Sequence, residues 1–154
     1  MINRLIEKLY LKQKGNLAYY DNLTQVYNRM FYERELKKKY IGKECVVTFV
    51  DVNGLKIIND NKGHYEGDKL IIKVVEDLKK INYIDYIIRY GGDEFILISD
   101  KLKREELEKV KHISYGISMK AAYEDMSSAI AKADVLMYKQ KENLKKGDSY
   151  YWQW

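Results

Sequence analysis

Three acidic side chains occupy positions from which they could bind a metal ion. Asp51 ends an apolar, β-branched run, and Asp93 and Glu94 directly follow a pair of glycines. Without a cluster of Cys or His, carboxylate oxygens in twos and threes favour Mg²⁺ shared with phosphate oxygens over zinc. The sequence therefore predicts a divalent-metal site for phosphate chemistry. The alternative is that turns are rich in Asp and Gly in any protein.

The relative position of these carboxylates depends on a predicted hairpin. The run that ends at Asp51 is typical of a central strand that is buried on both faces. Gly91 and Gly92 separate two strand-like segments, and two glycines accept the positive φ angles of a tight primed turn. We expect the second strand of this hairpin to pair beside the first run. Because successive side chains of a strand alternate between faces, only one of Asp93 and Glu94 is expected to join Asp51.

Helix-like and strand-like segments alternate along the chain without a repeat or a low-complexity linker, which predicts an α/β (α+β) layer architecture. Helical apolar spacing and β-branched runs set the bounds of each segment. The expected helices span residues 2–19, 29–39, 69–80, 102–110 and 127–145, with a short helix after Asn53-Gly54 and a glycine-containing loop over 61–68. The expected strands span residues 45–51, 83–90, 94–99 and 112–118, with a further candidate strand at 150–152.

The composition limits the classes of protein to consider. A chain of 154 residues has room for one ordinary domain, and no separate sensor domain is expected in it. Apolar residues at 46% argue against disorder, and no apolar stretch approaches the roughly 18 residues of a membrane span. The net charge of +5 is weak grounds for nucleic-acid binding, because basic and acidic residues are interleaved. The single cysteine offers no disulfide or zinc framework, so we expect a cytoplasmic protein.

Five short motifs follow one another along the chain. They are Asp21-Asn22-Leu23-Thr24 with Asn28-Arg29, the segment from Asp51 to Asp60 with Gly63-His64 and Gly67-Asp68, Arg89-Tyr90-Gly91-Gly92-Asp93-Glu94-Phe95, Ser114-Tyr115-Gly116, and Ala133-Asp134 with Tyr138 and Lys141. In this order and at this spacing they resemble the GGDEF family, the diguanylate cyclases. The resemblance divides the chain into an amino-terminal amphipathic linker helix over residues 1–20 and a GGDEF catalytic domain over residues 21–154.

The resemblance implies a palm-like fold, in which a central mixed sheet is flanked by helices. It also implies the condensation of two GTP molecules into cyclic di-GMP with release of pyrophosphate. By position, the side chains of Asp51 and Glu94 and the Val52 carbonyl would bind Mg²⁺ (or Mn²⁺), and Asp93 would lie near the attacking ribose 3′-hydroxyl. This agrees with nucleotidyl transfer, in which metal ions neutralise the charge that spreads over the phosphate oxygens.

A substrate pocket is implied as well. Asn59 and Asp68 would recognise guanine, whose N1–H and exocyclic amine form a donor pair that a carboxylate accepts. Lys141 and Lys145 would bind phosphate, with Lys145 in the place of a more usual Arg. On the residues alone, both lysines could equally lie on a solvated helix face. The remaining expected substrate contacts are Asn53, Gly54, Leu55 and Lys56, through backbone N–H groups, together with Gly91 and Gly92.

Three functions remain open at this point. The first is cyclic di-GMP synthesis by a transient homodimer, since each protomer would hold one GTP and the two substrates would meet across a twofold interface. The second is a module that binds GTP or a dinucleotide without turnover, which would normally show a broken acidic pair. The third is a related defence-type synthase of another cyclic oligonucleotide. A regulator is expected outside this chain, and the helix at 2–19 either promotes dimerisation or packs against the domain.

Two departures from the family pattern concern regulation and length. Many members carry a product-binding R-x-x-D motif before the glycines, whereas here Asn82 replaces the Arg and Asp85 remains. Asn lacks the guanidinium fork that binds phosphate and guanine, so product inhibition through this motif is not expected. The segment from Ile96 to Ile113 is shorter than usual, which indicates a trimmed peripheral helix.

Overall fold

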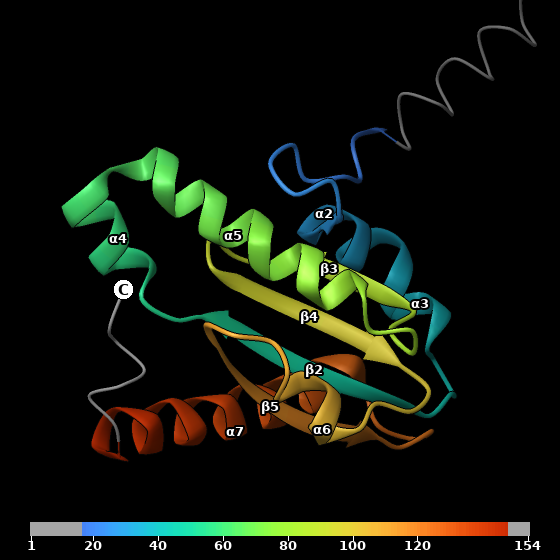
Figure 1. The fold of residues 1–154 in the computed structure, drawn as a ribbon. Helices are drawn as coiled ribbons and strands as arrows, with labels where there is room; N and C mark the ends of the chain where they lie inside the picture. The colour runs from blue at the N-terminus through green and yellow to red at the C-terminus, as the bar shows by residue number, and fades with distance from the viewer. Residues whose placement is uncertain (1–16, 148–154) are drawn as a thin grey trace, which may run out of the picture.

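A five-stranded mixed sheet forms the centre of the molecule, as Figure 1 shows. The computed structural model describes residues 17–147. The strands are β1 (Tyr27–Asn28), β2 (Cys45–Val52), β3 (Tyr86–Arg89), β4 (Glu94–Ser99) and β5 (Ile113–Lys120). Their order is β1-β3-β4-β2-β5, with β1 parallel to β3 and the other neighbouring pairs antiparallel. The predicted pairing of the hairpin strand β4 beside β2 is confirmed.

Helices cover both faces of this sheet, with α5 on one face and α7 on the other (Figure 1). The helices are α2 (Arg29–Phe31), the π-helical η1 (Tyr32–Leu36), α3 (Lys37–Lys39), α4 (Leu55–Lys62), α5 (His64–Lys79), α6 (Arg104–Leu107) and α7 (Met126–Gly147). Within residues 17–147, no helix is both long and apolar enough to cross a membrane. The predicted α+β class, a mixed sheet flanked by helices, is confirmed.

Each face of the sheet has its own hydrophobic core, because side chains alternate along the strands. In β2, Val50 and Val52 pack on the α5 side, whereas Val47 and Phe49 pack on the α7 side. Burial on both faces explains why β2 is a continuous apolar run in the sequence. The same alternation places Asp51, near the end of β2, on the α7 side.

The helical segment over residues 29–39 begins where the sequence predicts. The side chain of Asn28 caps it by accepting a hydrogen bond of 3.1 Å from the Phe31 N–H. Residues Tyr32–Leu36 then form a π-helical turn, so that α2, η1 and α3 are one run rather than a uniform α-helix. Tyr32 and Leu36 are buried in the core on the α7 side.

The prediction of a loop over residues 61–68 is wrong, because helices occupy most of this segment. α4 continues to Lys62, and α5 begins at His64 rather than at residue 69. Gly63 alone separates the two helices, with a φ of +87° that favours glycine. The density of glycines predicted a longer loop, but Gly67 lies inside α5 without interrupting it.

Several other bounds differ from the predicted ones. β3 starts at Tyr86 rather than at residue 83, and α6 spans only Arg104–Leu107 rather than 102–110. β5 starts after His112, whose φ of +63° is incompatible with a strand. Residues 18 and 19 form a turn rather than the end of a helix. The rest of the predicted amino-terminal helix, up to residue 16, and the candidate strand at 150–152 lie outside the described residues.

Candidate active site

Asp51 and Glu94 lie side by side at the ends of the two central strands. They are directly opposite each other in the register of β2 and β4, and opposite residues of antiparallel strands point to the same face. This is the face covered by α7. Asp51 lies two residues after Phe49, and Glu94 lies two residues before Ile96, and both of these apolar residues pack in the core on the α7 side. The strands therefore bring the carboxylates of Asp51 and Glu94 together.

Lys141 reaches Asp51 from α7. It lies one helical turn beyond Met137, which packs in the core on this side of the sheet. Its Nζ is 2.6 Å from Oδ1 of Asp51. Since only 7% of Asp51 is exposed, solvent screens this ion pair weakly. Lys145, one turn further along α7, is exposed and pairs with Glu142 at 3.0 Å.

The carboxyl groups of this site have raised pKa values. Burial raises the pKa of Asp51, and the ion pair with Lys141 offsets this only in part. Burial also raises the pKa of Glu94, and the negative charges of Asp93 and Asp51 raise it further. Asp134 of α7 acts on both pKa values in the same direction. A bound cation stabilises the charged form of carboxylates that lie close together and are partly buried.

The turn between β3 and β4 differs from the predicted one. Neither Gly91 nor Gly92 has a positive φ, so the prediction of a primed turn is wrong. The N–H groups of Tyr90 and Gly91 both donate to the Glu94 carbonyl, at 2.8 and 3.1 Å. An ideal Cβ on Gly91 would lie 2.5 Å from Oε2 of Glu94. The Glu94 carboxylate therefore occupies the space beside Gly91, and the glycine is not needed for an unusual backbone angle.

Arg89 fixes this turn through two sets of hydrogen bonds. Its Nε and Nη2 donate to the Gly92 carbonyl at 3.2 and 2.8 Å. Its Nη1 is 3.1 Å from both carboxylate oxygens of Asp21. Asp21 in turn accepts hydrogen bonds from the N–H and the hydroxyl of Thr24, at 2.8 and 2.7 Å. The sequence motifs contain Asp21 and Arg89 but give no sign of their pairing, which joins positions 68 residues apart.

Hydrogen bonds also hold the connection from β2 to α4. The Val52 N–H donates to the Asp93 carbonyl at 2.9 Å, and the Asn53 N–H donates to the His112 carbonyl at 2.8 Å. The side chain of Asn53 is buried and accepts a hydrogen bond of 2.9 Å from the Ser114 hydroxyl. Asn53 thus joins the end of β2 to the start of β5, a role that the sequence motifs do not indicate.

The other predicted substrate contacts lie on α4 and α5. Gly54 precedes α4 with a φ of +77°, and Leu55 and Lys56 form the first residues of that helix. Asn59 is half-buried on α4, and Asp68 is exposed on α5. The two helices pack against each other on the face of the sheet opposite α7 (Figure 1). These residues therefore form a second group, separate from Lys141.

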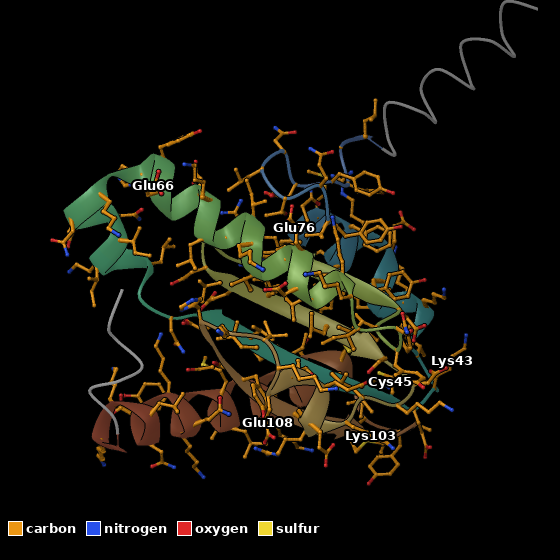
Figure 2. All side chains as sticks on the ribbon, in the orientation of Figure 1. Lys43, Cys45, Glu66, Glu76, Lys103 and Glu108 are labelled. Atoms are coloured by element: carbon orange, nitrogen blue, oxygen red, sulfur yellow. The ribbon has the colours of Figure 1, made fainter. Side chains whose placement is uncertain are left out.

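The donor set of the site suits a hard cation. In the part of the chain that the structure describes, no three Asp, Glu, His or Cys side chains are close enough to hold a metal by themselves. Asp51 and Glu94 form a pair, and Mg²⁺ is commonly held by one or two carboxylates together with substrate phosphates. Figure 2 shows Cys45 near the opposite end of β2, and burial raises the pKa of its thiol to about 11. The cysteine is thus no part of this site.

A mixed sheet that carries paired carboxylates at the ends of its antiparallel central strands, with helices on both faces, defines a palm-like α+β domain. Within this class, the chain belongs to the family described as "Diguanylate cyclase, GGDEF domain", whose sequence profile matches residues 18–112. This family assignment confirms the resemblance that the motifs carry.

Individual relatives agree with the assignment. The chain is 32% identical to signaling protein YkoW of Bacillus subtilis and 28% identical to diguanylate cyclase VdcA of Vibrio cholerae, in each case over 91% of this chain. A solved structure of the coiled coil and GGDEF domain of DgcB from Caulobacter crescentus, in complex with c-di-GMP, superposes with a TM-score of 0.80 at 23% identity. That match covers 93% of this chain and 90% of the other, and it shows the shared fold.

The chain spans less than half the length of the curated relatives, 21% of YkoW and 48% of VdcA. The similarity therefore concerns the GGDEF domain and not the remainder of those proteins. Diguanylate cyclases of this family use a divalent metal ion, with which the carboxylate pair is compatible.

Proposed function

We propose that this domain is a diguanylate cyclase, which condenses two GTP molecules into cyclic di-GMP with release of pyrophosphate. The observation that supports this most is the carboxylate pair, because Asp51 is buried, Glu94 lies opposite it in register, and the charge of Asp51 raises the pKa of Glu94. A module that only binds nucleotide would normally have a broken acidic pair, whereas Asp93 and Glu94 are both present.

We propose Mg²⁺, or Mn²⁺, as the metal, held by the side chains of Asp51 and Glu94 and by the Val52 carbonyl. Hard oxygen donors of this kind suit both ions. A bound ion would neutralise the triphosphate charge and so favour in-line attack on the α-phosphate. Lys141, held at the same carboxylate, would add a positive charge for phosphate, and Lys145 would add a second.

The reacting groups would be placed by the turn and by the connection after β2. Asp93 lies in the turn that Arg89 fixes, from which it would orient or deprotonate the attacking 3′-hydroxyl. The backbone of Gly91 and Gly92 would lie close to the substrate, since the space beside Gly92 is open and the Glu94 carboxylate fills the space beside Gly91. The N–H groups of Gly54, Leu55 and Lys56 would bind the terminal phosphates at the start of α4, whereas the Asn53 N–H, which the motifs also suggested, already donates to the His112 carbonyl.

Guanine would be recognised by the group on α4 and α5. Asp68 would accept hydrogen bonds from the N1–H and the exocyclic amine, and the amide of Asn59 would suit the acceptors on the other edge of the base. Adenine lacks the N1–H, which would leave the carboxylate partly unpaired at a cost of about 1–3 kcal/mol. We therefore expect Asp68→Ser to weaken the preference for GTP over ATP, as measured by kcat/KM for each nucleotide.

We further propose that the active form is a transient homodimer. Each protomer would bind one GTP on its own Asp51 and Glu94, and the two substrates would face each other across a twofold axis. Residues 1–20 would act as a linker helix to the catalytic domain over residues 21–154, and a regulator outside this chain would raise the effective concentration of the second site. The domain would work in the cytoplasm, where it would meet GTP.

The proposed reaction can be tested by incubating the chain with labelled GTP and Mg²⁺ and separating the products. Cyclic di-GMP is expected from the wild-type chain and not from Glu94→Gln. Bound but unconverted GTP would indicate a binding module instead, and a different cyclic product from mixed nucleotides would indicate another synthase. The initial rate per milligram should also rise over a hundredfold increase in enzyme concentration. A constant rate from a chain that stays monomeric would exclude the two-protomer reaction.

A further inference from the structure

Gly67 lies in α5, opposite the side chain of Asn59. This side chain fills the space that a side chain at position 67 would need. Gly67 is the fourth residue of α5 and is buried against α4. An ideal Cβ on Gly67 would be 1.9 Å from Oδ1 of Asn59, 2.9 Å from its Cγ, and 3.0 Å from Cδ1 of Leu55. The side-chain amide of Asn59 therefore sits in the gap that the glycine leaves.

The backbone of α5 gives no reason for a glycine at this position. The φ of Gly67 is not positive, and α5 runs unbroken through it from His64. Inside a helix, glycine is less favourable than alanine by about 1 kcal/mol. The positive φ that joins α4 to α5 belongs to Gly63. Gly67 thus lowers the stability of α5, and what it provides is space for Asn59.

The gap lies beside the group proposed to bind guanine. Asp68 follows Gly67 directly and is exposed, and Asn59 is half-buried on the facing helix. Figure 2 shows Glu66, the residue before Gly67, near the end of the helix pair where α4 meets α5. A Cβ at position 67 would move the end of the Asn59 side chain and leave Asp68 on its helix.

We infer that Gly67 is a positioning residue for base recognition, because it sets where the Asn59 amide lies relative to Asp68. The inference rests on the proposed function, in which Asn59 and Asp68 bind guanine. The alternative role for Gly67 is close packing of α4 on α5 alone. Under that alternative, a side chain at position 67 would affect stability and all nucleotides equally, and it would not act through Asn59.

A double-mutant cycle separates the two roles. Gly67→Ala, Asn59→Ala and the double variant would be compared for their affinity for 3′-deoxy-GTP and 3′-deoxy-ATP, which lack the attacking hydroxyl. We expect Gly67→Ala to weaken 3′-deoxy-GTP binding about tenfold, the effect of one or two lost hydrogen bonds, with much less change for 3′-deoxy-ATP. In the Asn59→Ala background, which removes the overlapping amide, the same change should alter the affinity less than twofold.

Thermal unfolding gives an independent readout of the same contact. Gly67→Ala should raise the melting temperature more in the Asn59→Ala background than in the wild type, because the overlap with the amide is then gone and only the tight contact with Leu55 offsets the helix preference of alanine. Gly147→Ala is a control for the substitution itself, since this exposed glycine ends α7 and its Cβ would meet nothing within 4 Å. It should leave nucleotide affinity unchanged.

Two results with the variants would overturn the inference. One is unchanged 3′-deoxy-GTP affinity in Gly67→Ala, and the other is an equal loss with and without the Asn59 side chain. A wild-type chain that does not bind 3′-deoxy-GTP would overturn it as well. A wild-type chain that binds the analogue but makes no cyclic di-GMP would contradict only the proposed function, and the binding cycle would still decide the role of Gly67.

Discussion

Two shielded aspartates, Asp21 and Asp51, each pair with one cationic side chain, yet their pKa values move in opposite directions. Burial tends to raise the pKa of Asp21, but hydrogen bonds from Thr24 and Arg89 outweigh it and lower the value. At Asp51 burial prevails over the single contact with Lys141, and nearby acidic groups add to the increase. One carboxylate is fully supplied with donors, whereas the other is held beside like charges.

This difference distinguishes a carboxylate that stabilises the fold from one that is available for chemistry. The oxygens of Asp21 accept from the backbone and hydroxyl of Thr24 and from the Arg89 guanidinium, which also holds the turn between β3 and β4. Asp51 lies opposite Glu94, and the negative charges of Asp93 and Asp134 raise the pKa of Asp51 further. Removing the charge should therefore have opposite consequences for stability at the two positions.

The largest expected effect is on turnover in Asp51→Asn. An amide cannot supply the negative charge that a metal ligand provides, so the rate of cyclic di-GMP formation should fall on the order of a thousandfold. The raised pKa of Asp51 shows that the folded state disfavours its charge, so the melting temperature at neutral pH should not fall. Near-normal turnover would refute the assignment of Asp51, and a large loss of stability would refute the comparison.

A smaller effect of the opposite kind is expected for Asp21→Asn. The asparagine keeps an acceptor for Thr24 but loses the charged contact with Arg89, so the free energy of unfolding should fall by about 1–3 kcal/mol. Turnover per folded molecule should change much less than in Asp51→Asn. Asp77→Asn is a control, because Asp77 also pairs with cationic side chains, but its partners Lys73 and Lys80 are exposed and such pairs contribute little. Chemical denaturation of the wild type, Asp21→Asn and Asp77→Asn would rank their free energies of unfolding.

The smallest effect is a dependence on pH that differs in sign between the two sites. The folded pKa of Glu94 is raised, so its charge destabilises the fold above that pKa, and the penalty disappears as the pH falls through it. The folded pKa of Asp21 is lowered, so its stabilisation is complete above the unfolded pKa and is lost as the pH falls through the folded one. At neutral pH, Glu94→Gln should therefore melt at a higher temperature than the wild type and Asp21→Asn at a lower one. Both differences should shrink as the pH falls. Two variants that both melt above the wild type at neutral pH, or both below it, would contradict this account.

Strand alternation and motif spacing predicted the central part of the site. The continuous apolar run before Asp51 indicated a doubly covered strand, and the hairpin indicated that one acidic residue would lie beside it. The family resemblance then singled out Glu94, which the register places opposite Asp51. The short helix after Gly54 and the cap at Asn28 were also predictable, because each depends on neighbouring residues alone.

The remaining features depend on contacts between distant parts of the chain. Gly91 indicated a turn with positive φ, whereas its φ is not positive and the Glu94 carboxylate fills the space beside it. The bond between Asn53 and Ser114 joins residues 61 positions apart, and no local pattern predicts it. Glycine density over 61–68 predicted a loop because it does not distinguish Gly63, which breaks the helix, from Gly67, which packs within one.

The presence of two separate cores has a consequence for how such a domain can diverge. Helices α4 and α5 pack on one face of the sheet, and α7 with Lys141 packs on the other. Substitutions that repack one face therefore leave the packing of the other intact, since the buried strands lie between them. In evolutionary terms, the base-binding group proposed on α4 and α5 could change in a lineage that keeps Asp51, its partner Lys141 and the packing of α7 as they are.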